Sequence, residues 1–327
     1  MIKQSLRLAG WTTSLLALAA TASADVKLNE NFSVGGYTVG SYQYTKMDGS
    51  PATDRFDLDA VKTLFTASFK PVTGVVSLYY PGVDGNDVTV LDAYATYDIG
   101  GGYTVTGGKF LSYLGYEAFD PVNMTQITYA APTLGSMFSI PAYHSGVRLD
   151  YSDSAHSFGL ALLDSVYSPT SVFKGDGELI HNGGFEAYYK YTGTEKLTIF
   201  TGLGYDTKGG FQPHSVLTLN LWAQYAFTSE LTGAVEFANT DGGPGKEGSA
   251  WLVYLGYAPG GPVSWTFRVS GDLPDDSVTY AEDYMQYTIC PTYKFTDNLS
   301  VRAEYSYYDY DSGGSKSFFG VQALFKF

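Results

Sequence analysis

The chain has 327 residues, 44% of them hydrophobic and 16% aromatic, with a formal net charge of −14 and one cysteine. This acidic balance argues against nucleic acid as a partner, because phosphate binding needs clusters of Lys and Arg. The single Cys290 excludes an intrachain disulfide and a finger-type zinc site, and we expect it to be a small strand residue.

The first 24 residues have the pattern of a secretory signal peptide. Lys3 and Arg7 precede an apolar stretch at 8–20, and Ala22-Ser23-Ala24 forms an A-x-A cleavage site before Asp25. No later stretch of about 18 apolar residues could cross a bilayer as a helix. A closed barrel is therefore the only spanning structure open to this chain, and we expect one such domain over 25–327.

Sixteen segments of alternating apolar and polar residues follow the leader. Successive side chains of a strand point to opposite faces, so each segment has an apolar face and a polar face. Transmembrane β-barrels are built of such strands, with the apolar face toward lipid. The segment cores are 34–46, 56–69, 75–80, 88–99, 103–110, 143–151, 157–166, 185–192, 197–205, 216–227, 231–239, 250–257, 263–271, 284–295, 299–309 and 317–327.

The connections between segments alternate between two kinds. Every second one is a tight turn, as at 71–74, 100–102 and 228–230, and the others are longer and rich in Gly and Asp. Short periplasmic turns and long external loops give this alternation in outer-membrane barrels. The sequence thus predicts an all-β, antiparallel, up-and-down transmembrane barrel of about 16 strands, with 14 and 18 as alternatives.

Individual segments show which face points inward. In the tenth, Leu219 and Leu221 alternate with Asn220 and Trp222, and in the thirteenth Arg268 falls on the polar face. Charges that face lipid are strongly disfavoured, so the polar faces should point into the lumen. Barrels of 16 to 18 strands leave an aqueous channel, which these faces would line.

The longest connection, residues 111–142, is the third external loop in this topology. Loops of this length are usually functional. Its sequence, with Leu114, Phe119, Ile127 and further apolar residues, is too apolar for a solvated external loop. We therefore expect it to pack against another part of the barrel.

Three motifs resemble a known family. They are L-N-E-N-F-S-V-G-G-Y-T-V-G-S-Y at 28–42, G-K-F-L-S-Y-L-G-Y-E at 108–117, and I-P-A-Y-H-S-G-V-R-L-D-Y at 140–151. Together they are similar to the OmpL-like family of β-barrel outer-membrane porins. The resemblance implies a bacterial outer-membrane pore for passive diffusion of small hydrophilic solutes and ions, without a defined substrate.

The resemblance also implies that the third loop folds into the lumen and narrows it. Acidic loop groups opposite basic wall groups would make a transverse field that orients polar solutes. The alternative is plain lumen salt bridges, with Arg148 pairing Asp150 or Glu186 and Arg302 pairing Glu304. The expected loop residues are Tyr113, Glu117, Asp120, Asn123, Gln126 and Tyr129, and the expected wall residues are Lys109, His144, Arg148, Lys190, Arg268 and Arg302.

Lys109 needs a local irregularity to reach the lumen. Strict alternation from Tyr103 and Val105 turns it toward lipid, and a bulge at Gly107-Gly108 would return it to the inner face. We expect this bulge.

The acidic excess falls mainly in the external loops, for example at Asp176, Asp241 and Asp283. Such residues would solvate the loops and bind lipopolysaccharide through divalent cations. A negative mouth also concentrates cations, so we expect a mild cation preference.

The last segment ends at Phe327, with Phe319 and Phe325 on its apolar face and Gln322 and Lys326 on the other. A terminal aromatic residue resembles the closing-strand signal of bacterial outer-membrane proteins, so we expect the assembly machinery to recognise Phe327. General porins of this size are commonly trimers, so a homotrimer is one assembly open to this chain, and nothing in the sequence marks which surface it would bury.

Three other functions remain as alternatives. A sugar-selective channel would use aromatic residues such as Tyr116 and Trp222 as stacking surfaces. An enzyme is disfavoured, because His144 and Ser145 point to opposite faces of a strand and no G-x-S-x-G or H-E-x-x-H run is present; we expect no metal and no cofactor. A non-conducting adhesive or structural barrel would require a plugged lumen.

Overall fold

The computed structural model describes residues 25–82, 87–130, 141–167, 183–207, 214–243, 247–275 and 282–327. The expected signal peptide, residues 1–24, lies outside them. No helix in these described ranges is long and apolar enough to cross a bilayer. The elements are β1 (Val26–Lys27), β2 (Phe32–Met47), β3 (Thr53–Phe69), β4 (Val72–Tyr80), β5 (Thr89–Gly100), β6 (Tyr103–Leu111), the 3-10 turn η1 (Pro121–Asn123), β7 (Tyr143–Ser152), β8 (His156–Leu163), β9 (Gly184–Tyr191), β10 (Leu197–Asp206), β11 (Val216–Ala226), β12 (Leu231–Asp241), β13 (Glu247–Tyr257), β14 (Val263–Pro274), β15 (Tyr284–Lys294), β16 (Leu299–Tyr310) and β17 (Ser315–Lys326).

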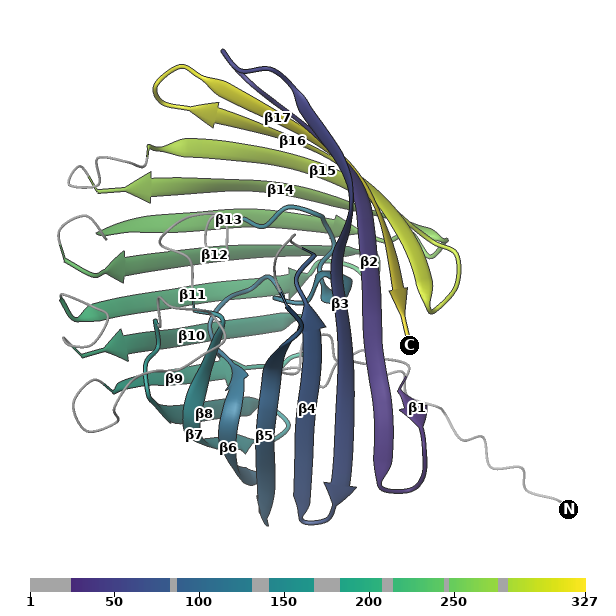
Figure 1. Ribbon diagram of the computed structural model, residues 1–327. Coiled ribbons are helices and arrows are strands. Elements are labelled where there is room, and N and C mark those ends of the chain that lie inside the picture. Colours follow the sequence, from purple (N-terminus) through teal and green to yellow (C-terminus); the bar gives the residue numbers. More distant parts are fainter. Residues whose placement is uncertain are drawn as a thin grey trace, which may run out of the picture.

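The strands β2 to β17 form one closed antiparallel barrel, in which each strand pairs with the next along the chain. β17 pairs with β2, with Val321 opposite Tyr42, and Figure 1 shows these two strands side by side. Closure removes the free edges that an open sheet would expose. The predicted 16-strand barrel is confirmed, and each predicted segment coincides with one of these strands.

The two faces of each strand separate as the alternation predicted. Leu219 is 44% exposed and Leu221 is 50% exposed, whereas Asn220 between them is fully buried. On β14, Phe267 is 41% exposed and Arg268 only 1%. The apolar face therefore points outward and the polar face points into the barrel.

Aromatic side chains gather at the short-turn ends of the strands. Tyr103 and Tyr151 have ring centroids 4.7 Å apart, and so do Tyr293 and Phe295. Rings of this kind form the girdles that mark the membrane interfaces of outer-membrane barrels.

The buried core lies inside the barrel. Two clusters of buried apolar residues there join inward side chains of the wall to residues of the third loop, Tyr113 and Leu114 in one cluster and Phe119 in the other. Phe110, at the end of β6, and Tyr143, at the start of β7, lie in these clusters, so the loop bends inward directly where it leaves the wall.

Candidate functional site

The described part of the third loop, residues 112–130, lies in the lumen and bonds to the wall on opposite sides. The amide of Tyr116 donates to Glu236 on β12 at 2.8 Å. Asp120 pairs with Lys62 on β3, at 3.2 Å between Nζ and Oδ2. The amide of Thr128 donates to Glu304 on β16 at 3.1 Å. The described part of the loop, up to residue 130, therefore spans the lumen.

Inward polar side chains of the wall hold the first part of this loop by accepting hydrogen bonds from it. Glu186 on β9 accepts from the hydroxyl of Ser112 at 2.7 Å and from the amide of Tyr113 at 3.1 Å. Asn220 on β11 accepts from the amide of Gly115 at 2.9 Å. A loop segment without regular structure must find partners for its backbone groups, and these inward side chains supply them.

Stacked aromatic rings support the same part of the loop. Tyr188, Phe200 and Trp222 lie on neighbouring strands; the Tyr188 and Phe200 centroids are 5.7 Å apart, and those of Phe200 and Trp222 are 5.1 Å apart. Tyr113 packs on Tyr188 at 4.5 Å and Tyr116 on Trp222 at 5.6 Å. The three wall rings are between 2% and 8% exposed, so the protein itself covers the faces that a sugar would need.

The hydroxyls of two loop tyrosines are buried hydrogen-bond donors. Tyr116 donates to Gln224 on β11 at 3.0 Å, and Tyr129 donates to the carbonyl of Phe119 at 2.7 Å. Burial raises the pKa of both hydroxyls above its ordinary value, so both stay protonated and keep these bonds.

Asp120 is the centre of a charged cluster at the middle of the loop. It accepts a hydrogen bond from Tyr37 at 2.8 Å and pairs with Lys62, which also pairs with Asp92 at 3.0 Å. Lys62 donates to Tyr143 as well, at 3.2 Å. One lysine thus neutralises two carboxylates in part, and the cluster keeps a negative balance.

Glu117 pairs with Arg268 on β14, at 2.5 Å between Oε1 and Nη1. Glu117 also accepts from the side chain of Gln126 at 2.5 Å and from the amide of Ala130 at 2.8 Å. Arg268 donates to the carbonyl of Thr128 at 2.7 Å. The pair therefore folds the loop back on itself and fastens the fold to the wall.

Arg302 on β16 binds the backbone of the loop rather than a carboxylate. It donates to the carbonyls of Met124 at 2.7 Å and Pro121 at 3.1 Å, and its Nε donates to Gln322 at 2.8 Å. The salt bridge that we considered between Arg302 and Glu304 is not formed. Glu304 instead accepts from loop amides, because these donors would otherwise be buried without partners.

Acidic groups of the loop lie opposite basic groups of the wall, as predicted, but the two sets are in direct contact. Glu117 touches Arg268 and Asp120 touches Lys62, so these charges meet their partners directly rather than facing them across open water. Arg148 pairs with Asp150 at 3.3 Å, as the salt-bridge alternative expected. The loop is closer to the wall than the transverse-field hypothesis supposed.

The other predicted site residues have separate places. His144 lies on the inner face, 2% exposed, with its ring 5.4 Å from that of Phe110. Lys190 is also on the inner face and is 7% exposed. Asn123 is exposed and is the last residue of η1.

The prediction for Lys109 was wrong. Thr106 and Phe110 are each 1% exposed on the inner face, so the unbroken pairing of β6 with β7 turns Lys109 outward. Gly108 has a φ of +132°, but the register does not shift there and no extra residue is inserted. The ammonium of Lys109 donates to the carbonyl of Val90 at 2.8 Å.

The sequence did not identify a second inward segment, which follows β8. Asp206, at the end of β10, accepts from the hydroxyl of Ser165 at 2.8 Å and from the amides of Val166 at 2.6 Å and Tyr167 at 2.8 Å. Val166 packs in the same apolar cluster as Tyr113. Lys62 and Asp206 were missed, although polar side chains at alternating positions were a usable signal for the inner face, and Asn220 was predicted on the inner face without being named as a site residue.

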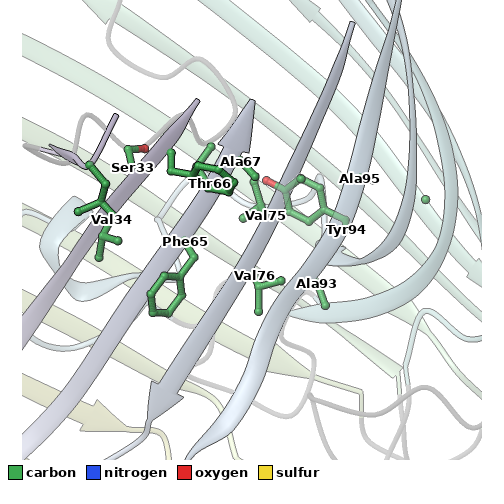
Figure 2. A pocket seen from close by; sticks show the side chains of 14 residues that line it. Ser33, Val34, Phe65, Thr66, Ala67, Val75, Val76, Ala93, Tyr94 and Ala95 are labelled. Carbon is green, nitrogen blue, oxygen red and sulfur yellow. The ribbon is translucent and has the colours of Figure 1, made fainter. Parts of the chain in front are cut away.

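A depression of about 520 Å³ lies outside the lumen, across β2 to β6. Figure 2 shows Phe65, Val76 and Ala93 among the residues that line it. Phe65 is 44% exposed and Val76 is 45% exposed, which places this depression on the outward face of the barrel. Its lining is apolar apart from Ser33, Thr66 and Tyr94, so it is separate from the polar site in the lumen.

Comparison with solved structures gives the same fold. The outer-membrane channel DcaP of Acinetobacter baumannii is 13% identical, with a TM-score of 0.63 over 92% of this chain and 99% of that one. An anion-selective porin from Comamonas acidovorans is 12% identical, with a TM-score of 0.67 over 90% and 99%. OmpT of Vibrio cholerae, folded in vitro and in a trimer form, is 14% identical, with a TM-score of 0.62 over 91% and 100%.

A search among curated proteins found no match. The sequence profile of the family described as Putative beta-barrel porin-2, OmpL-like, matches residues 62–327, which is most of the chain. This match agrees with the closed barrel and its polar lumen, and it places the protein in the bacterial outer membrane. The chain belongs to the OmpL-like family of β-barrel porins.

Proposed function

We propose that the protein is a porin for passive diffusion of small hydrophilic solutes and ions, narrowed by its third loop. The observation that carries this proposal is a closed barrel of 16 strands with polar inner faces and a loop that crosses its lumen. Barrels of this size are too wide for wall side chains alone to fill. A loop held at fixed points therefore determines what can pass.

The narrowest part is proposed to lie where the loop meets the wall. We assign the loop side to Tyr113, Glu117, Asp120, Asn123, Gln126 and Tyr129, and the wall side to His144, Arg148, Lys190, Arg268 and Arg302. Lys109 is not part of it, because it faces outward.

We also propose a mild cation preference. Several carboxylates inside the barrel have neutral hydrogen-bond partners: Asp59 accepts from Ser41 at 2.8 Å and Gln322 at 2.7 Å, and Glu236 accepts from Asn220 at 2.8 Å. Acidic residues at the loop ends, such as Asp241, add to the negative electrostatic potential of these carboxylates. An excess of negative charge along a passage raises the local concentration of cations.

One observation favours a second candidate, a barrel that its loop keeps closed. Inner-wall side chains on distant strands are almost fully covered, with Lys62 at 6%, Asn220 at 0% and Arg302 at 2% exposure. Such a barrel would conduct only after the loop moves. The sugar-selective alternative has less support, because the stacked rings of Phe200 and Trp222 are covered.

Further proposals concern processing and partners. We infer that the mature chain starts at Asp25 and that it has no enzymatic activity.

The trimer form of OmpT supports a homotrimer for this fold. The acidic external loops would bind lipopolysaccharide through divalent cations. Phe327 would direct assembly, and it bonds to Gly36 on β2 through both backbone groups, at 2.8 Å and 3.0 Å.

Planar-bilayer recording tests the proposed function. Stepwise openings with a reversal potential on the cation side, across a gradient of potassium chloride, are the expected result. An anion-side reversal would overturn the cation preference alone. Well-folded protein that never conducts would overturn the diffusion porin and support the closed barrel.

A further inference from the structure

Arg148 on β7 has surroundings unlike those of the other inner-wall arginines. Its guanidinium carbon lies 4.5 Å from the ring centroid of Phe110, 5.4 Å from that of Tyr113 and 6.0 Å from that of Tyr94. Aromatic rings attract a cation through their negative faces. Three rings from β5, β6 and the loop therefore hold this guanidinium in place.

The hydrogen-bonding capacity of this guanidinium is largely unused. It carries five N–H donors, and Asp150 Oδ2 lies 3.3 Å from Nε without the alignment of a hydrogen bond. The other oxygen of Asp150 accepts from the hydroxyl of Tyr113 at 2.8 Å. Within the described residues, no other oxygen accepts from the side chain of Arg148.

The contrast with the two loop-binding arginines is direct. Arg268 and Arg302 are 1% and 2% exposed, and each donates to loop carbonyls. The side chain of Arg148 is 18% exposed, and that of Asp150 is 20% exposed. Of these three arginines, Arg148 is thus the one that solutes in the lumen can reach.

Arg148 lies on β7 between the covered His144 and the short-turn end of the strand. Along β7 the inward residues are His144, Gly146, Arg148 and Asp150, and side-chain exposure increases from 1% at His144 to 18% at Arg148 and 20% at Asp150. β7 ends at Ser152, in a tight turn. The inner wall is therefore less covered at Arg148 and Asp150 than at His144, and the loop reaches this height through the hydroxyl of Tyr113, which bonds to Asp150.

We propose that Arg148, with Phe110, Tyr94 and Tyr113 around it, is a subsite for the oxyanion group of a solute, a carboxylate or a phosphate. A guanidinium binds such groups through two parallel N–H donors, and its fork is held ready here by the three rings. The subsite rests on the proposed function, because it names one class of solute that the porin would carry. The acidic lumen favours cations in general, and Arg148 delays anionic solutes at one point.

Binding and conduction are measured separately. Isothermal titration of the full-length, detergent-solubilised protein uses benzoate, inorganic phosphate and the neutral analogue benzamide as probes. We expect benzoate or phosphate to bind and benzamide not to bind. R148Q should weaken the binding at least tenfold, and R148K, which keeps the charge without the fork, should weaken it less.

R55Q is the matched control. Arg55 on β3 also pairs with a nearby carboxylate, Asp57 at 3.1 Å, but its side chain is 63% exposed and it donates to Gln43 at 3.0 Å. R55Q should bind like the wild type. Heat-modified mobility in gels confirms that each variant is a folded barrel.

The outcomes separate the subsite from the porin. No binding of either oxyanion to the wild type, or equal binding by R148Q, overturns the subsite even where bilayers conduct. Binding that R148Q abolishes supports the subsite, and a silent bilayer with the same protein would then overturn only the proposed conduction. The two probes show whether the subsite takes carboxylates, phosphates or both.

Discussion

Glu117 Oε1 lies 2.5 Å from Arg268 Nη1, and this ion pair joins the third loop to β14 across 151 positions of sequence. The Arg268 side chain is fully buried and that of Glu117 is 4% exposed. Leaving one partner of such a pair buried alone costs about 3–5 kcal/mol. The loop can avoid this cost only by moving away from the wall.

Arg268→Gln should therefore release the loop without unfolding the barrel. We expect larger or flickering single-channel conductance in planar bilayers and faster proteolytic cleavage within the loop. Lys294→Gln is the control, because the pair of Lys294 with Asp297 is exposed at 59% and 89% and contributes little. Unchanged conductance and cleavage in Arg268→Gln would show that the pair does not hold the loop.

Glu236 and Glu304 should hold opposite parts of the loop independently. Glu304→Ala removes the acceptor for the amides of Ile127 and Thr128, and Glu236→Ala removes the acceptor for the amide of Tyr116. Hydrogen–deuterium exchange read by mass spectrometry should become faster in the peptide around 127–128 for the first variant and around 116 for the second. Equal changes in both peptides for both variants would mean that the loop moves as one body.

Outward and inward positions of β11 should respond differently to the same substitution. Leu221→Arg places a charge on the lipid-facing side, which costs about 2–4 kcal/mol near the bilayer midplane. Gln224→Arg places it on the inner face, where Gln224 is half-buried beside Tyr116. Urea unfolding in lipid vesicles should show a clear loss of stability for Leu221→Arg only. A larger loss for Gln224→Arg would contradict the assigned faces.

Phe327→Ala should reduce assembly more than stability. The backbone of Phe327 bonds to Gly36 and remains able to do so after the substitution, but the terminal ring is lost. We expect less folded protein in outer-membrane fractions and normal folding in detergent. Phe295→Ala serves as the control, because it removes a ring that is 58% exposed in the tight turn after β15 and not at the end of the closing strand. Equal outer-membrane levels for both variants would argue against recognition of Phe327.

Much of this architecture follows from local pattern. The alternation of Leu219 and Leu221 with Asn220 sets the face of β11 wherever the strand lies, because successive side chains of a strand point to opposite sides. The lengths of the turns are also a local property, and short turns predict that each strand pairs with the next along the chain. The strand count, the inward faces and the position of the long loop were therefore accessible from the sequence.

Local pattern misled at Lys109. Two adjacent glycines allow a bulge, but whether one forms depends on the partner strands. Here Gly107 and Gly108 pair in unbroken register with Val147 and Gly146, and Lys109 stays outward. Propensity alone could not decide between the two registers.

The sequence by itself determined a closed barrel with a polar lumen and a long third loop, because a period of two and short turns are properties of neighbouring residues. Only the tertiary structure decided that Glu117 meets Arg268, that Lys62 joins Asp92 to Asp120, and that Arg148 keeps its donors open. These pairs form when closure brings distant strands and the loop to one height in the lumen. A buried charge or amide without a partner is costly, so each one pairs with a side chain that the strand register places beside it.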